Sequence, residues 1–305
     1  MTTLFPTTGS SPEALLDALG DIEVDVQRNR AVVAGQAMRA ANRAELRAKL
    51  AAALYDRFHV GKIVSTPEPP GLRSRLIAAV PHEFTAVRGR VLSRDSGSET
   101  IVEIEGVRVR VTECQIASRT EGEYVSINLG CVRPNLAPDF VLVDGSAGHG
   151  LTPAGHTLRV YAHLLDPETA PAAWRAILVF LEEKRVPFRA KISLRVPRRD
   201  ALVLYLGPEA WPSASDIADS LARQPGLGHA VSAYAHQLSP GVAAAWDPAD
   251  PRPGYQGLSF GEHRSHALAD ALLSPETPAD QLAAALAAGN VDPTRIYRNI
   301  TSPAV

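Results

Sequence analysis

The feature of this sequence that most limits its fold is a pair of alternating segments separated by one long helical segment. TLRVYAHLL (157–165) and VPFRAKISL (186–194) each alternate apolar and polar residues with the period of two that is typical of β-strands. PETAPAAWRAILVFLEEKR (167–185) lies between them, and its apolar spacing predicts a helix. A strand, a helix and a strand in this order predict a crossover connection with the helix packed on one face of a sheet.

The same period assigns the residues of both strands to opposite faces. One face carries only apolar residues, which we expect to lie beneath the crossover helix: Leu158, Val160, Ala162, Leu164, Phe188, Ala190, Ile192 and Leu194. The other face carries Arg159, Tyr161 and His163 on the first strand and Arg189, Lys191 and Ser193 on the second. If the strands share a sheet, the two arginines and the lysine repel one another unless water or a bound anion separates them. The polar face is therefore either a phosphate site or an open, solvated surface.

The remaining segments predict an α+β fold. A short helix at 12–19, a hairpin, and a longer helix that starts at Asn42 with Glu45 precede an antiparallel β-meander from Phe84 to the strand FVLVDG. After the crossover, ALVLYLG predicts a strand joined by a hairpin, and GHAVSAYAHQL suggests another. Further helices are expected in WPSASDIADSLARQ, QGLSFGEHRSHALADALL and PADQLAAALAAGN. We expect the C-terminal half to be a mixed sheet with a crossover helix and covering helices.

The glycine-rich run GSAGHGLTPAGHT marks the predicted organisational boundary of the chain. We predict an N-terminal helical and β-meander region at 1–145, a loop or hinge at 146–157, and an α+β core at 158–305.

Composition excludes several classes of function. The 305 residues carry a net charge of -2 with a pI near 6.5, which gives no global reason to expect nucleic acid or a membrane surface as a partner. No window approaches the roughly 18 unbroken apolar residues of a membrane span. The N-terminus has no basic region followed by an apolar run, and the cysteines Cys114 and Cys131 make no disulfide framework, so we expect a cytoplasmic protein. The histidines lack partners at metal-ligand spacing, and we expect no metal and no cofactor.

Lysine is rare in this chain. Of the 31 basic residues only Lys49, Lys62, Lys184 and Lys191 are lysines. Arginine keeps its proton at working pH whereas lysine can release it, so chemistry that needs a base would retain a lysine against this bias. Lys191, beside two arginines, is the candidate base.

The segment SFGEHRSHALADALL contains an unusual helix start. Ser259 and Glu262 form a capping-box pattern, which places His263 and Arg264 in the first turn. Cations in a first turn are unfavourable next to the positive end of the helix dipole, so they suggest an anion bound in front of the helix. The alternative is that His263 and Arg264 simply face solvent. Together with the sheet face, this set suits phosphate elimination: Lys191 removes the Cα proton, the arginines hold the phosphate, and His263 protonates the leaving oxygen.

Several blocks in order resemble the HopA-type effector-like proteins. They are LAAALYDRFHVG, LRVYAHL, VPFRAKI, RRDALVLYL, SFGEHRSHALADAL and RIYRNITSP. Members of that family occur among secreted effectors of plant pathogens and as stand-alone lyases in class V lanthipeptide and thioamitide pathways. The resemblance implies catalytic roles for Lys191 and His263, phosphate binding by Arg159 and Arg264, and supporting roles for Asp200 and Tyr205. From their place on the same polar strand face, we expect Arg189 to bind phosphate as well and Tyr161 to support the site.

The resemblance also implies a substrate and a partner. A kinase-like phosphotransferase would phosphorylate serine or threonine in a ribosomal precursor peptide, and this chain would eliminate the phosphate to leave dehydroalanine or dehydrobutyrine. Two alternatives remain. One is a catalytically silent binding partner of the kinase-like protein or of the precursor peptide, and the other is a secreted effector.

Overall fold

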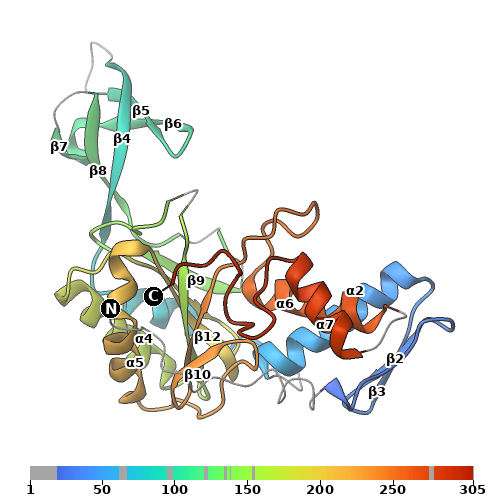
Figure 1. The fold of residues 1–305 in the computed structure, drawn as a ribbon. Helices are drawn as coiled ribbons and strands as arrows, with labels where there is room; N and C mark the ends of the chain where they lie inside the picture. Colours follow the sequence, from blue (N-terminus) through green and yellow to red (C-terminus); the bar gives the residue numbers. More distant parts are fainter. Residues whose placement is uncertain are drawn as a thin grey trace.

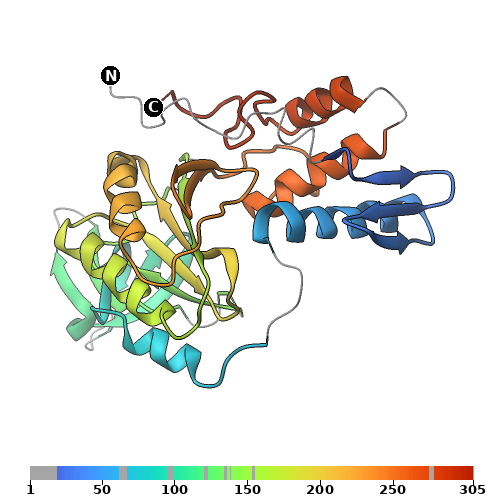
Figure 2. The ribbon, with the colours of Figure 1, turned by 90° about the horizontal axis from the view of Figure 1, so that it is seen from below.

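The computed structural model describes residues 19–61, 67–94, 99–119, 123–133, 136–137, 139–152, 155–274 and 278–304. Within these ranges the chain forms three antiparallel sheets with helices packed on both faces of the largest one (Figures 1 and 2). The predicted α+β class is confirmed. The short helix expected at 12–19 lies outside the described ranges except for its last residue.

The largest sheet has six strands in the order β13-β14-β10-β12-β11-β9. Their bounds are β9 Phe140–Asp144, β10 Leu158–Leu164, β11 Arg189–Ser193, β12 Arg198–Leu206, β13 His236–Ser239 and β14 Val242–Trp246. The predicted hairpin is confirmed, because β11 pairs with β12. Every neighbouring pair is antiparallel, whereas we expected a mixed sheet. The difference arises because β10 and β11, which the crossover makes parallel, are not neighbours in the sheet. Strand β12 lies between them and pairs antiparallel with both.

The apolar face of this sheet is buried as predicted. The eight alternating residues of β10 and of Phe188–Leu194 all belong to one core cluster, together with Trp174, Ile177 and Leu178 of the crossover helix. The helices on this side are α3 Leu72–Ala78, α4 Ala170–Glu183 and α5 Ala214–Ala222, with the 3₁₀ turn η3 Pro208–Ser213 leading into α5. Figure 2 shows them on one side of the sheet.

A second group of helices covers part of the polar face. It contains α2 Arg43–Leu54, the π-helical turn η1 Tyr55–Val60, α6 Phe260–Leu272 and α7 Pro278–Ala288. The predicted start of α2 is confirmed, because the Asn42 side chain accepts a hydrogen bond from the Glu45 amide. Helix α2 packs against α6, so the N-terminal and C-terminal parts of the chain share one core cluster (Figure 2). The small sheet of β1 Glu23–Asp25, β2 Arg30–Val33 and β3 Gln36–Arg39 lies at the far end of this layer (Figure 1).

The β-meander forms a separate five-stranded sheet that extends away from the rest of the chain (Figure 1). It consists of β4 Phe84–Arg94, β5 Glu99–Ile104, β6 Val107–Thr112, β7 Ile116–Arg119 and β8 Tyr124–Gly130, with the 3₁₀ turn η2 Glu113–Gln115 before β7. The strand β9, which we expected to complete the meander, pairs with β11 in the central sheet instead.

The described part of the glycine-rich run is tied to its neighbours. The Gly145 amide donates to the Phe188 carbonyl at 2.8 Å, and the Ser146 side chain bonds to Glu182 of α4. His149 Nε2 lies 2.8 Å from a carboxylate oxygen of Glu105 in the meander. None of the described helices has the length and apolar character that crossing a membrane requires.

Candidate functional site

The polar face of the central sheet brings the predicted cations together. Arg159, Tyr205 and Arg189 lie opposite one another in one row across β10, β12 and β11, and Asp144 of β9 continues that row. The next row places Lys191 two residues further along β11. The predicted shared face of the two arginines and the lysine is confirmed.

Arg159 is nearly buried, with 8% of its surface exposed. Its guanidinium forms an ion pair with Asp247, which follows β14, and lies 4.8 Å from the centre of the Tyr205 ring. Burial alone would lower the pKa of Arg159, but the nearby Tyr205 and Asp247 raise it overall. Arg159 therefore stays charged at the sheet surface.

Arg189 shares one buried carboxylate with a second arginine. Asp144 is fully buried and accepts from Arg189 Nε at 2.6 Å and from Arg133 Nε at 3.1 Å. Burial would raise the pKa of Asp144, but the hydrogen bond and the charge of Arg189 lower it below its usual value. Two guanidinium groups against one carboxylate leave a net positive charge at this edge of the sheet.

Lys191 differs from both arginines, because among the described residues its ammonium has no carboxylate within ion-pair distance. Its Nζ lies 4.4 Å from the Phe140 ring centre and 5.7 Å from the Tyr205 ring centre. Aromatic ring faces attract the cation without accepting its proton. The two rings thus position the Lys191 ammonium, while no described carboxylate compensates its charge.

Asp200 reaches this face through a β-bulge. The register between β10 and β12 shifts beyond Ala162, and both Ala201 and Leu202 belong to the core beneath α4. The bulge turns Asp200 toward the helical layer, where Arg198 donates to both of its oxygens at 2.6 and 2.8 Å. Burial would raise the pKa of Asp200, but the charge of Arg198 and then that of His59 lower it to about 2.

His59 is a site residue that the sequence analysis did not single out. It lies in the π-helical turn η1, is 2% exposed, and has Nδ1 at 2.8 Å from the Ser232 hydroxyl and Nε2 at 3.6 Å from Asp200. Burial lowers its pKa to about 4, so the imidazole is neutral near pH 7. Local π-helical turns often occur at functional sites, and His59 stood in one of the blocks that carried the family resemblance.

The charges on this face do not cancel. Five cations, Arg133, Arg159, Arg189, Lys191 and Arg198, face three carboxylates, Asp144, Asp200 and Asp247. The excess of two positive charges matches the charge of a phosphate monoester dianion.

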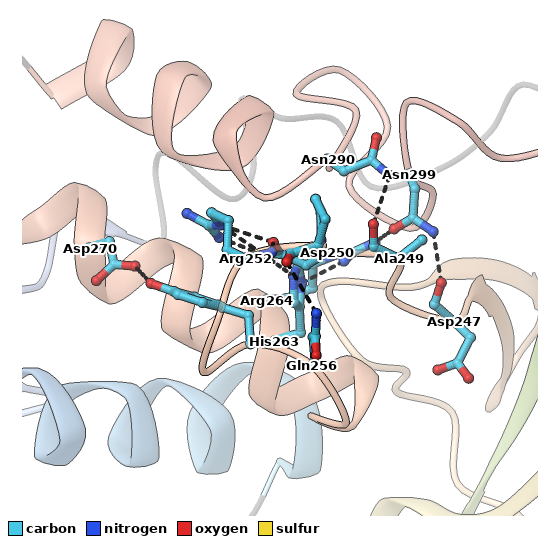
Figure 3. A network of polar contacts seen from close by, with 12 residues as sticks. Asp247, Ala249, Asp250, Arg252, Gln256, His263, Arg264, Asp270, Asn290 and Asn299 are labelled. Carbon is cyan, nitrogen blue, oxygen red and sulfur yellow. Dashed lines mark hydrogen bonds and ion pairs between the residues drawn. The ribbon is translucent and has the colours of Figure 1, made fainter.

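The helix start was predicted correctly, but its first turn is closed to solvent. Ser259 and Glu262 form the expected capping box at the start of α6. His263 and Arg264 have no exposed surface at all. His263 Nε2 donates to Asp250 at 2.9 Å, and its Nδ1 accepts from Arg264 Nη1 at 2.8 Å (Figure 3).

Arg264 continues this buried chain of hydrogen bonds. Its guanidinium donates to the Ile296 carbonyl at 2.8 Å and to the Asn299 side chain at 3.1 Å. Figure 3 shows Arg264 and Asn299 in this network. Burial, and then the charge of Arg264, lower the pKa of His263 to about 4. In this conformation neither side chain can contact a phosphate, because protein groups occupy the hydrogen-bonding positions that the sequence analysis assigned to one.

Two pockets lie along the row of arginines. One, of about 380 Å³, is lined by Arg159, Asp247, Asp250 and Tyr255, among others. The other, of about 560 Å³, is lined by Arg189, His149, His156 and again Asp247. Both volumes fall in the range of small-molecule and side-chain sites. Lys191 lies one row further from both pockets, and His263 lines neither.

The described residues include no group of three or more His, Cys, Asp or Glu side chains arranged to hold a metal ion. The arginines of the site pair with carboxylates, but the cations outnumber these carboxylates, which favours the binding of an anion.

The comparison with known families agrees with the sequence blocks. The model of the HopA1 effector protein family matches residues 131–298, which is more than half of the chain. The chain belongs to this family. The matched range includes every candidate residue of the sheet face and of α6, whereas His59 lies before it.

A solved structure of a bacterial effector protein has a similar fold. The structure of the effector protein from Pseudomonas syringae pv. tomato strain DC3000 is similar to this chain with a TM-score of 0.50 at 16% identity, covering 86% of this chain and 91% of that one. The effector protein from Pseudomonas syringae pv. syringae strain 61 gives a TM-score of 0.47 at 16% identity, covering 82% and 89%. No curated protein sequence matches this chain. At this identity the likeness shows the fold alone.

Proposed function

We propose that this HopA1-family chain is a metal-independent lyase that eliminates phosphate from phosphoserine or phosphothreonine in a ribosomal precursor peptide. The observation that carries the proposal is Lys191, the one cation of the polar face that has no carboxylate partner among the described residues. It lies next to the row that contains Arg159 and Arg189.

The proposed reaction needs one base and one anion site. The Lys191 ammonium first releases a proton to solvent, and the resulting amine takes the Cα proton, the electron pair forms the Cα–Cβ double bond, and the Cβ–O bond breaks. Arg159 and Arg189 hold the phosphate oxygens as charge develops on the leaving group. The products are dehydroalanine or dehydrobutyrine and inorganic phosphate.

The leaving oxygen also needs a proton to depart as hydrogen phosphate. His263 was expected to supply this proton, but its burial and its two hydrogen bonds favour a positioning role instead. The hydroxyl of Tyr205, whose ring lies between Arg159 and Lys191, is the better-placed donor in this geometry. Tyr205→Phe keeps the ring and removes only this proton.

The proposed substrate requires an earlier phosphorylation. A kinase-like phosphotransferase would supply the phosphopeptide. We propose that this phosphotransferase and the present chain both act in the cytoplasm. The two pockets beside the arginines are large enough for a phosphorylated side chain and its neighbours.

The test is elimination from a phosphopeptide by Lys191→Arg, which keeps the charge but not the removable proton. We expect normal folding and a rate reduced by about 10²–10⁴. The readout is the mass loss of roughly 98 Da, the mass of phosphoric acid, that accompanies each elimination. Lys184→Arg at the C-terminal cap of α4, where the ammonium lies over Phe180, is the matched control and should keep full activity. Full activity of Lys191→Arg would remove Lys191 from the mechanism.

A catalytically silent binding partner is the second candidate. The observation that favours it is that Arg159 and Arg189 already have carboxylate partners, as a purely structural face would. In that case the wild-type protein binds the kinase-like protein or the precursor peptide and causes no mass loss, and Lys191→Arg changes neither result.

A further inference from the structure

The three carboxylates of the polar face differ in how firmly they are held. The Asp144 side chain has no exposed surface and binds two arginines, and the Asp200 side chain is 8% exposed and is held through both oxygens by Arg198. The Asp247 side chain is 34% exposed and, within the part of the chain that the structure describes, pairs with Arg159 alone. Asp247 is therefore the carboxylate that can turn into water most easily, because its own charge is already partly solvated.

The backbone of Asp247 is fixed, so this freedom belongs to its side chain. The Asp247 amide donates to the Thr157 carbonyl at 2.9 Å, and the Asn299 side chain donates to the Asp247 carbonyl at 2.7 Å (Figure 3). Asn299 is itself held by the buried Arg264. The chain of hydrogen bonds through α6 thus fixes the position from which the Asp247 carboxylate reaches Arg159.

One donor of Arg159 is left over by the hydrogen bonds that the described residues make. Its Nε is buried and has no hydrogen-bond partner of good geometry among the described residues. The buried hydroxyl of Tyr161 also lacks such a partner, although Tyr161 lies close enough to help raise the pKa of Arg159. Unsatisfied buried donors are rare in folded proteins, and Arg159 also lines the pocket of about 380 Å³.

Asp247 also stands between the two pockets. It lines the pocket beside Arg159 and the pocket beside Arg189, together with the two residues that follow it. A movement of its side chain would change the charge in both pockets at once.

We infer that Asp247 is an exchangeable internal anion, which occupies Arg159 in the free protein and is displaced by the phosphate dianion of a ligand. This rests on the proposed role of Arg159 as a phosphate ligand. The exchange keeps the buried guanidinium paired in both states, which avoids the cost of an isolated buried charge. A dianion gains more from Arg159 than the carboxylate that it replaces, whereas a monoanion such as acetate gains no more. Asp247 therefore sets the affinity for anions at this site.

The experiment measures binding of inorganic phosphate at pH 8 by isothermal titration calorimetry to the full chain and to Asp247→Asn. We expect the variant to bind phosphate roughly tenfold more tightly, because the competing partly buried ion pair is gone. Acetate at the same ionic strength should bind measurably to the variant and not to the wild type. If Asp247→Asn does not fold, Asp247→Ser, whose hydroxyl offers Arg159 a neutral acceptor, takes its place with the same expectation.

The controls separate exchange at Arg159 from a general change in charge. Asp25→Asn removes the same charge from an exposed Arg28 pair in the distant small sheet and should leave phosphate affinity unchanged. Adding Arg159→Met to Asp247→Asn should abolish the gain. Unchanged phosphate affinity in the Asp247 variants, an equal gain in Asp25→Asn, or a gain that survives Arg159→Met would each overturn the inference.

The outcome is also separable from the proposed lyase activity, because binding of inorganic phosphate requires no elimination. If the affinities change as expected and no phosphopeptide loses phosphate, the lyase proposal fails and the exchange at Arg159 stands. If elimination occurs and the affinities do not change, only the exchange fails.

Discussion

The buried position of His263 leads to a prediction that separates a structural role from acid catalysis. His263→Ala removes the acceptor of Arg264 Nη1 and the donor to Asp250. Neither partner can turn to solvent, because Arg264 and the Asp250 side chain have no exposed surface. We therefore expect the variant to lose stability first, and activity only as a consequence.

The magnitude follows from burial and from the lost hydrogen bonds. A buried polar group left without its partner costs about 1–3 kcal/mol. Truncating a fully buried ring to a methyl group adds a cavity, and the combined loss should be roughly 3–5 kcal/mol. For a chain of this size that lowers the melting temperature by roughly 5–8 °C.

Calorimetry of the wild type, His263→Ala and His266→Ala would measure this loss. His266 lies one turn further along α6, and its Nδ1 has no hydrogen-bond partner among the described residues, so its removal costs packing alone. We expect His266→Ala to lower the melting temperature by less than half as much. Phosphopeptide elimination is then measured well below both melting temperatures, where the folded fraction of His263→Ala should retain most of its activity.

One result would refute this reasoning. If His263→Ala melts within 2 °C of the wild type, about 1 kcal/mol, and yet loses elimination by about 10² or more, the imidazole reaches the substrate in a conformation different from this one. Partial rescue on a peptide whose leaving group needs no proton would then identify it as the acid.

Two further predictions concern His59 and its neighbours. The pKa values of His59 and His263 are lowered from 6.5 to about 4 on folding, so the unfolded chain binds protons first as pH falls. The free energy of unfolding, measured in urea, should decrease from pH 6.5 to pH 4 by up to roughly 3 kcal/mol for each histidine. His59→Gln should make this pH dependence shallower. An unchanged slope in the variant would contradict the lowered pKa of His59. A Cβ at Gly261 would overlap the His59 ring, whereas one at Gly130 would meet open space. Gly261→Ala should therefore cost about 1–3 kcal/mol and Gly130→Ala much less, and equal melting temperatures would argue against this packing.

Much of the fold was readable from the sequence because its signals are local. The alternation of β10 and β11 predicted both faces of the sheet, and it was confirmed residue by residue in the core beneath α4. The caps of α2 and α6 were likewise predicted from side chains three residues apart, Asn42 with Glu45 and Ser259 with Glu262. Such patterns depend only on residues close in sequence, so they can be recognised without knowing how the rest of the chain folds.

The strand pairing was less predictable. The place of β9 beside β11, and the bulge that turns Asp200 to the polar face, depend on which strands meet. A bulge interrupts the period of two and leaves no mark on composition. The acid at the end of FVLVD, Asp144, was visible, but its role as the partner of Arg189 was not.

The sequence by itself determined that Arg159, Arg189 and Lys191 share a face, and the tertiary structure decided which of them is paired. Asp247 reaches Arg159 only because β14 lies beside β10. His263 and Arg264 were expected to face an anion, but Asp250, 13 residues away, and Ile296 and Asn299, 32 and 35 residues away, close over them. A period or a cap fixes the direction of a side chain from its own backbone, whereas burial and ion pairing depend on segments that only the folded chain brings together.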